Sequence, residues 1–395
     1  MQIGIVGKPN VGKSTMFGAA TMAPVEIADY PFTTIDPNKG VGYVRYPCPC
    51  RELGVQCDPH NSLCINGTRM IPVDLLDVAG LVPDAWQGRG LGNKFLDDLR
   101  QADALVNVVD ASGSTNIEGV SGRPGQFDPS DDVMFLRHEI DCWMREILKD
   151  GLGKIARAAR MKGSKPEEVL AERLAGLKVT EGQIKSALEK VLLPDDPTQW
   201  DDERLLALCA EIRRASKPMI IAMNKADIAP AENLEKLSGF GEEAVPTMAE
   251  AELALRRAEK SGIIQYVPGD EKFRIKEGSP LSDVQRRALD RMATNMGKYG
   301  GTGVQRCLED AVFKTLGYIP VFPVEDENRL ADHSGRVLPD CHLVPGGSTA
   351  KDLAYRIHTD LGDRFIRAVN ARTKRTVGAD YVLQPGDIIR IIASK

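Results

Sequence analysis

Apolar residues recur along this chain of 395 residues in two patterns, which separate strands from helices. Short runs, alternating or continuous, fall at residues 2–6, 69–76, 104–109 and 217–223, and they predict strands. Helical signals stand between these runs. This order predicts an α/β fold in which a mostly parallel sheet is flanked by helices.

Helical spacing fills residues 128–214, between two of the predicted strands. Ser130 begins a stretch in which apolar residues recur at steps of three and four, and Thr180 with Gln183 forms a capping box for a second helix. We therefore expect a helical insertion in the α/β core. A second insertion, irregular and rich in cysteine, covers residues 47–67.

A smaller domain is expected after this core. Residues 318–324, with two prolines, mark the passage from a first domain at 1–318 to a second at 319–395, which carries short strand signals and a helix around 349–361. From Ser334 onward, ten Lys and Arg stand against six Asp and Glu, a net charge of +4. These basic side chains could contact RNA phosphates, although such a modest excess of positive charge is also typical of a solvated surface.

The composition is that of an ordinary globular protein. The net charge of the whole chain is −5, which argues against a protein that coats nucleic acid, and we expect no DNA partner. No apolar run approaches the roughly 18 residues that a membrane span needs, and the motif that begins at Gly7 leaves no room for a cleavable signal. We therefore expect a cytoplasmic protein with no membrane partner.

The first strand signal runs directly into a glycine-bounded loop and a helix start, in the pattern G-x-x-x-x-G-K-[ST] of phosphate-binding loops. Glycines let backbone N–H groups turn toward an anion, and the helix N-terminus adds its own. Lys13 would contact the β- and γ-phosphates, and Ser14 would bind Mg²⁺. The residues expected to hold the nucleotide here are Gly7, Lys8, Pro9, Asn10, Val11, Gly12, Lys13, Ser14 and Thr15.

A D-x-x-G motif follows the strand signal at 69–76, about seventy residues after the phosphate loop. The carboxylate of Asp77 can hold Mg²⁺ through a water, and the N–H of Gly80 can approach the γ-phosphate. In the exposed loop that precedes this strand, Thr33 or Thr34 could close on Mg²⁺ and γ-phosphate. Either could equally remain a solvated hydroxyl.

The motif Asn224-Lys225-Ala226-Asp227 follows the last of these strand signals. The carboxylate of Asp227 can accept two parallel hydrogen bonds from N1–H and N2–H₂ of guanine, a donor pair that adenine lacks. The stem of Lys225 can lie over the base, and Asn224 can connect this loop to the phosphate loop. The expected ligands are therefore GTP and GDP with Mg²⁺.

Four of the eight cysteines cluster in the second insertion. Cys48, Cys50, Cys57 and Cys64 offer four soft ligands within seventeen residues, and His60 is a fifth candidate. Their spacing, C-x-C-x₆-C-x₆-C, differs from the common zinc patterns, which favour C-x₂-C. Structural Zn²⁺, one or two disulfides and unlinked thiols all stay open as interpretations.

The order, spacing and content of these motifs resemble the translation-factor-related GTPases and, among them, the Obg-like group that includes the YchF branch. The likeness covers nearly the whole chain, and the C-terminal module is similar to TGS domains, which are small β-grasp modules. The segments that carry the resemblance are 7–15, 30–38, 77–82 and 90–95 for the GTPase, and 377–381 and 383–387 for the TGS domain.

This resemblance implies a conformational switch that hydrolyses GTP and is linked to ribosomes or translation, with the TGS domain as the route to ribosome or RNA. It assigns the Mg²⁺ contact in the switch loop to Thr34 and a base contact to the backbone N–H of Ala249. Some members of the YchF branch use ATP through an altered base-reading motif. This chain keeps Asn224, Lys225 and Asp227, which favours GTP.

The residue after Gly80 is Leu81, at the place where Ras-like proteins carry a glutamine that orients water. Leucine cannot hydrogen-bond, so we expect slow intrinsic turnover. In similar GTPases the asparagine equivalent to Asn10 helps bind K⁺ beside the phosphates, so Asn10 either joins Lys13, Thr34 and Gly80 in catalysis or only braces the loop. A nucleotide-sensing scaffold with negligible hydrolysis stays open as an alternative, and a phosphotransferase ranks last because no acceptor site is visible.

Overall fold

The computed structural model describes residues 1–22, 38–78, 80, 83–87, 92–149, 151, 153, 165–194 and 197–394. Contacts between residues divide the chain into two compact units. Unit 1 comprises Met1–Met22, Pro37–Gly40 and Asp74–Cys307, and unit 2 comprises Ala23–Asp36, Val41–Val73 and Leu308–Lys395. The domain boundary at residue 318 stays a prediction.

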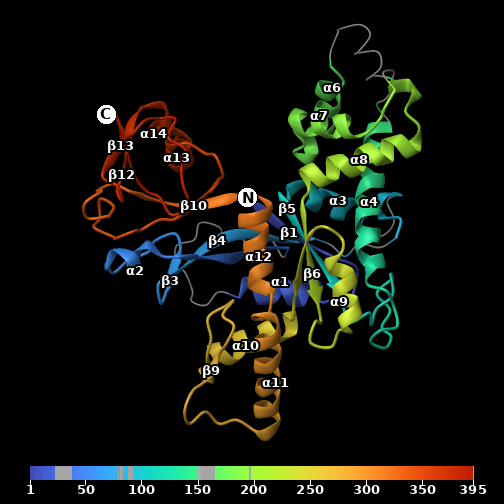
Figure 1. Cartoon of the computed structure of the whole chain (residues 1–395), viewed down its shortest axis with the longest axis horizontal. Helices are drawn as coiled ribbons and strands as arrows, with labels where there is room; N and C mark the ends of the chain where they lie inside the picture. The colour runs from blue at the N-terminus through green and yellow to red at the C-terminus, as the bar shows by residue number, and fades with distance from the viewer. Residues whose placement is uncertain are drawn as a thin grey trace. The chain divides into compact units, whose positions relative to one another are not determined.

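A parallel sheet forms the centre of unit 1 (Figure 1). In spatial order its strands are β4 (Thr68–Asp77, of which residues 74–77 belong to this unit), β1 (Gln2–Val6), β5 (Ala104–Asp110), β6 (Met219–Asn224) and β7 (Glu243–Pro246). The registers align Ile5 with Asp77 on one side and Asp110 with Asn224 on the other. Because parallel strands end at one edge of a sheet, this edge collects the predicted motifs. The predicted fold class is confirmed.

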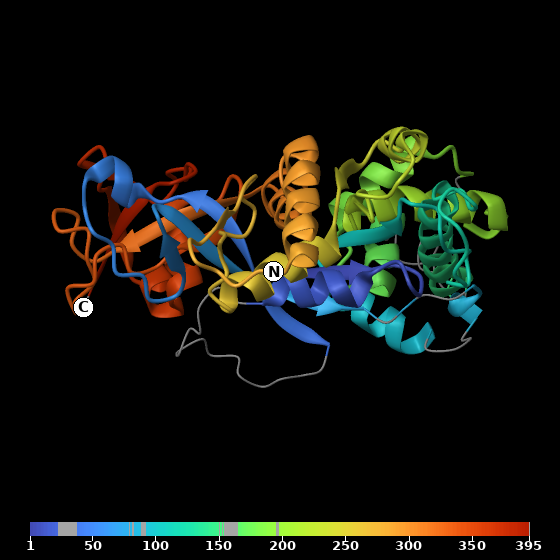
Figure 2. The same cartoon turned by 90° about the horizontal axis from the view of Figure 1, so that it is seen from below.

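Helices cover this sheet, and α1 and α10 lie side by side (Figure 2). The further elements of unit 1 outside the helical insertion are α1 (Lys13–Thr21), η1 (Ala85–Gln87), α3 (Gly92–Gln101), α9 (Ala231–Ser238), α10 (Ala249–Lys260), β8 (Ile264–Gln265), β9 (Arg274–Ile275), α11 (Asp283–Tyr299) and α12 (Val304–Glu309, of which residues 304–307 belong to this unit). Ala249, expected from the resemblance to contact the base, is the first residue of α10. The long helix α11 buries only Leu289 and Met296 of its seventeen residues.

Helices also fill the chain between β5 and β6, where a helical insertion is predicted. They are α4 (Ser130–Lys149), α6 (Pro166–Leu174), η2 (Ala175–Leu177), α7 (Glu181–Lys190), η3 (Pro197–Gln199) and α8 (Asp202–Ser216). The capping box is confirmed, because the Thr180 side chain accepts from the Gln183 N–H and the Gln183 side chain accepts in return. Trp143, Leu170 and Ile184 share one core between these helices. In the described part of the chain, no helix combines the length and apolar character that crossing a membrane requires.

The C-terminal part of unit 2 is a mixed sheet with helices beside it. Its strands, in spatial order, are β11 (His342–Pro345), β10 (Tyr318–Val324), β14 (Ile388–Ala393), β12 (Phe365–Asn370) and β13 (Arg375–Val377). Its helices are η4 (Asp310–Thr315), α13 (Ala350–Ile357) and α14 (Thr359–Asp363). The proline-containing segment 318–324 is thus a strand within this sheet rather than a connection, and Val321 and Phe322 in it are fully buried.

The cysteine-rich segment also belongs to unit 2, where β3 (Leu63–Ile65) pairs with the first residues of β4. The chain before β3 forms β2 (Lys39–Pro47, of which residues 41–47 belong to unit 2) and the short helix α2 (Pro49–Leu53). Backbone hydrogen bonds join it to a distant part of the chain, since the N–H of Asp58 donates to Val337 at 2.9 Å and that of His60 to Pro339 at 2.7 Å. Segments almost three hundred residues apart therefore fold together.

Candidate functional site

The phosphate loop joins the end of β1 to the start of α1, as its glycine spacing predicts. Three of its residues, Gly7, Asn10 and Gly12, have positive φ, with values of 155°, 64° and 95°. A side chain at Gly7 would put its Cβ 2.6 Å from the carbonyl oxygen of Val108, so only glycine fits against β5. Lys13 is the first residue of α1, so the loop ends on unpaired helical N–H groups that favour an anion.

Lys13 lies between the phosphate loop and the end of β4. Its Nζ donates to Oδ1 of Asp77 at 3.2 Å and to the carbonyl of Val78 at 2.7 Å. Gly80 lies beside the same loop, since a Cβ on it would be 3.8 Å from Cγ of Pro9. The structure therefore brings together the phosphate lysine, the expected Mg²⁺ carboxylate and the expected γ-phosphate N–H group.

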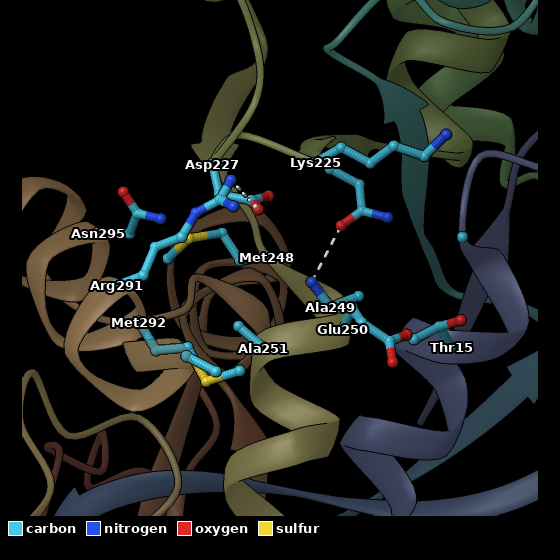
Figure 3. Close-up of a pocket in the computed structure, with 13 residues that line it drawn as sticks. Thr15, Lys225, Asp227, Met248, Ala249, Glu250, Ala251, Arg291, Met292 and Asn295 are labelled. Carbon is cyan, nitrogen blue, oxygen red and sulfur yellow. Dashed lines mark hydrogen bonds and ion pairs between the residues drawn. The ribbon is translucent and has the colours of Figure 1, made fainter. Parts of the chain in front are cut away.

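Asn224 connects the base-reading loop to two other parts of the site. Its Nδ2 donates to the carbonyl of Val11 at 2.8 Å. Its Oδ1 accepts from the N–H of Ala249 at 3.0 Å, a bond drawn as a dashed line in Figure 3. The connection to the phosphate loop is the one that the sequence predicts for Asn224. The N–H of Ala249, expected to contact the base, is bonded to Asn224 in this structure.

A cavity of about 360 Å³ opens beside these residues (Figure 3). Its lining residues are Gly12, Thr15, Asn224, Lys225, Asp227, Met248, Ala249, Glu250, Ala251, Ala288, Arg291, Met292 and Asn295. The lining therefore combines Gly12 and Thr15, expected to contact phosphate, with Asp227, expected to read the base. Four lining residues come from α11, which sequence patterns do not connect to the nucleotide. Among them, Nη2 of Arg291 lies 3.9 Å from Oδ2 of Asp227.

Asp110, at the end of β5, is a buried hub of the site that the motifs do not indicate. It accepts hydrogen bonds from Ser112, Ser114 and Thr115, and Nζ of Lys225 lies 2.8 Å from its Oδ2. Burial alone would raise the pKa of Asp110, but the hydrogen bonds from Lys225 and the serines lower this pKa below its ordinary value. The carboxylate therefore stays charged and fixes the Lys225 ammonium, which also donates to the carbonyl of Asn10 at 3.2 Å.

A second buried pair supports the phosphate loop from α4. Nζ of Lys8 lies 2.6 Å from Oδ1 of Asp132, and the two side chains are 3% and 5% exposed. The same Nζ donates to the carbonyl of Thr115 at 2.8 Å. Burial raises the pKa of Asp132 to about 6, although the positive charge of Lys8 opposes this shift. The sequence predicts Lys8 among the residues that hold the nucleotide, and in this structure its ammonium group instead anchors the loop to the helical insertion.

Asn10 is also held by a neighbouring loop. Its Nδ2 donates to the carbonyl of Gly119 at 2.9 Å, and a Cβ on Gly119 would lie 2.7 Å from the backbone oxygen of Pro9. The amide nitrogen of Asn10 thus braces the loop, as one of the two interpretations of this residue expects. Thr33, Thr34 and Leu81, to which the sequence assigns switch and water-orienting positions, lie outside the described residues.

The four clustered cysteines come together in unit 2. Sγ atoms of Cys48, Cys50, Cys57 and Cys64 all lie within 4.8 Å of one another, and none is in a disulfide. His60, the fifth candidate ligand, is instead near Asp340, with 3.4 Å between Nδ1 and Oδ1.

Comparisons with known proteins agree with this geometry. Three family descriptions match the chain: "50S ribosome-binding GTPase" at residues 2–134, "Obg-like GTPase YGR210-like, G4 motif-containing domain" at 222–326 and "TGS domain" at 334–393. A GTP-binding protein of Methanocaldococcus jannaschii is 52% identical, with 99% of each chain covered. The ribosome-binding ATPase YchF of Pasteurella multocida is 35% identical, with 98% of this chain and 97% of that one covered.

Among solved structures, a GTP-binding protein from Pyrococcus horikoshii OT3 matches with a TM-score of 0.78 and 42% identity, over 100% of both chains. The fold, the phosphate loop and the C-terminal module are therefore those of one known family, as the sequence resemblance implies. The chain belongs to the Obg-like, YchF-related GTPases and is a GTP-binding protein with a C-terminal TGS domain.

Proposed function

We propose that this protein is a guanine-specific, Mg²⁺-dependent switch that hydrolyses GTP slowly by itself and faster with a ribosomal partner. One observation supports nucleotide binding most directly. The side chain of Asn224 forms hydrogen bonds with both Val11 and Ala249, next to a cavity that Asp227 lines. These hydrogen bonds hold the phosphate loop and the base-reading motif close together, which supports the proposal that a single nucleotide contacts both. The preference for guanine rests on Asp227, which can pair with a donor edge that adenine lacks.

The residues fit the Mg²⁺ ion that the family implies. Lys13 and Asp77 are 3.2 Å apart, so this carboxylate reaches the phosphate loop, where Ser14 offers a hydroxyl. Oxygen donors of these two kinds are those that Mg²⁺ prefers. In our proposal Ser14, Asp77 and Thr34 hold the ion, which would neutralise charge on the phosphate oxygens when bound. The chain's own part is to orient the triphosphate through Lys13 and the backbone of Gly80.

Slow intrinsic turnover follows from Leu81, which cannot orient a water molecule. In our proposal Asn10 then helps to hold K⁺ beside the phosphates through its Oδ1, while its Nδ2 keeps its hydrogen bond to the carbonyl of Gly119. The test compares phosphate release in K⁺ and in Na⁺ buffers of equal ionic strength. Faster release in K⁺, lost in Asn10→Ala, is expected. Equal rates would leave Asn10 with the bracing role alone.

The proposed partner is the large ribosomal subunit, contacted through the TGS domain. The matching description at residues 2–134 and the name of the Pasteurella multocida relative both include ribosome binding. Exposed basic side chains on this domain provide chemistry suited to RNA phosphates. They are Lys351, Arg356, Arg364, Arg367, Lys374 and Arg375.

The deciding experiment follows γ-labelled GTP with and without ribosomes. Inorganic phosphate that increases with ribosomes supports the switch, and charge reversal at Arg364 and Arg367 should weaken co-sedimentation and this stimulation together. Negligible turnover under every condition would favour the alternative, a nucleotide-sensing scaffold. Label on an acceptor molecule would indicate a phosphotransferase instead.

A further inference from the structure

The four sulfur atoms of the cysteine cluster are spaced as in a metal tetrahedron. Sγ of Cys48 is 3.9 Å from Sγ of Cys57, and Sγ of Cys50 is 3.9 Å from Sγ of Cys64. Zinc–sulfur bonds of about 2.3 Å give tetrahedral sulfur–sulfur edges of about 3.8 Å. A disulfide needs about 2.05 Å between its sulfurs. The observed spacing therefore suits four ligands of one ion and not two disulfides.

The segment that carries these cysteines has little regular structure to hold it. Cys48 precedes the five-residue helix α2, Cys50 lies in its first turn, and Cys64 lies on the three-residue strand β3. Residues 54–62, which include Cys57, form neither helix nor strand. A metal ion bound by residues before, within and after this stretch would supply folding free energy that so short a segment cannot obtain from an apolar core.

A buried cation beside the cluster gives a second, independent argument. Arg69 is fully buried, its Nη2 donates to Sγ of Cys48 at 3.5 Å and to the carbonyl of Leu338 at 2.9 Å, and its Nη1 donates to Ser62. Its Cζ also lies 5.3 Å from the ring centroid of Phe322, but within the described ranges no carboxylate forms an ion pair with Arg69, and its Nε is buried without a hydrogen-bond partner. Arginine stays charged in proteins, and an uncompensated buried charge is costly. Four thiolates around a divalent ion carry two net negative charges, which would compensate this guanidinium.

We propose that Cys48, Cys50, Cys57 and Cys64 bind one structural Zn²⁺ ion, and that Arg69 stabilises the negative charge of this site. Four thiolates leave no open coordination position, so the ion has a structural role and does not act on a substrate. It holds the cysteine-rich segment in the form that pairs with residues 337–341 of the same unit. This site is separate in its chemistry from the proposed GTP hydrolysis.

The site is tested on the full-length protein, purified without chelators. Elemental analysis should find about one zinc per chain, and a mercurial reagent that titrates thiols should release it. Replacing the metal with Co²⁺ should give the visible absorption of a tetrahedral four-thiolate site, a measurement that needs no variant. Zinc near zero in protein that also fails to take up Zn²⁺ or Co²⁺ would overturn the proposal. Iron in the site, or four cysteines recovered as two disulfides, would overturn it as well.

Variants separate the ligands from other cysteines. Cys64→Ser should lose zinc, whereas Cys142→Ala, on α4 in unit 1, should keep it. Arg69→Met keeps all four thiols but removes the charge, so zinc should pass to a competing chelator about 10–100-fold more readily. GTP binding of each variant reports whether unit 1 is folded. An affinity of Arg69→Met for zinc equal to that of the wild type would show that Arg69 does not stabilise the site.

Discussion

Gly12 shows how one missing side chain shapes the nucleotide site. A Cβ at this position would lie 2.3 Å from Nδ2 of Asn224, and the backbone φ is 95°. Asn224 cannot move away without losing its bond to Val11. Gly12→Ala should therefore lower GTP affinity at least tenfold, measured by fluorescent-nucleotide titration, since it combines backbone strain with a displaced amide.

Gly18 provides the matched control on the helix that follows. A Cβ there meets nothing within 4 Å, so Gly18→Ala should leave GTP affinity unchanged. It should raise the free energy of unfolding by up to about 1 kcal/mol, because alanine favours a helix more than glycine does. Equal losses of affinity in the two variants would contradict the role given to the contact between Gly12 and Asn224.

Substitution of Asp227 can change which nucleotide the protein binds, and not only weaken GTP binding. An amide at this position offers one acceptor and one donor, which match N1–H and the 2-oxo group of xanthine. Asp227→Asn should therefore weaken GTP binding by about 100-fold and gain binding of XTP, because the charged bidentate pair with guanine is worth about 3 kcal/mol. Asp227→Ala should lose GTP without gaining XTP. Unchanged preference for GTP over XTP in Asp227→Asn would refute base reading by this residue.

Asp132 should make stability depend on pH. Its folded pKa of about 6 is above its ordinary value of 3.8, so between these values the folded protein binds a proton that the unfolded chain does not. The contribution of this group to stability is full at low pH and is lost as pH rises through 6, by about 3 kcal/mol at most. Asp132→Asn should remove this part of the slope in urea unfolding followed from pH 4 to 7. Parallel slopes for wild type and variant would show that Asp132 titrates normally.

At the scale of elements, strands and loops with strong local sequence patterns can be predicted. The position of α11 beside the nucleotide pocket cannot. Residues 2–6 are correctly predicted as a strand, and Ser130 and Thr180 as helix starts, because alternation, caps and glycines are local signals. Helix α11 has a capping box at Ser282 and Gln285 but few buried apolar residues. The capping box is therefore the one strong sequence signal of α11. Its contact with the nucleotide pocket depends on tertiary packing, which a local pattern does not predict.

The role of α11 can be tested at Met292, which lines the cavity. Met292→Ala should weaken binding of GTP and GDP by the same factor, about fivefold, because it removes about 1 kcal/mol of apolar contact with the base and none with the phosphates. Val284→Ala, on the same helix, changes a side chain that is 67% exposed and outside the cavity lining, and it should bind like the wild type. A loss that affects GTP but not GDP would place the effect at the phosphates.

At the scale of the whole molecule, sequence motifs predict which residues form the site, but they do not predict contacts between distant segments. Lys225 and Asp110 are 115 residues apart in the chain, and Arg69 and Leu338 are 269 apart. Lys225 belongs to a motif but Asp110 does not, and neither Arg69 nor Leu338 does, so no local sequence signal predicts either contact. The cysteine spacing indicates a cluster but leaves zinc, disulfides and free thiols open, and the fold shows that the four sulfurs lie within 4.8 Å of one another.

The central claim is that this chain hydrolyses GTP in preference to ATP. The most direct measurement is phosphate release from GTP and from ATP, at equal concentrations with Mg²⁺ and K⁺, under single-turnover conditions. We predict GDP and phosphate in equal amounts from GTP, at a rate at least about 100-fold above that from ATP. Equal rates for the two nucleotides, or faster release from ATP, would contradict the account.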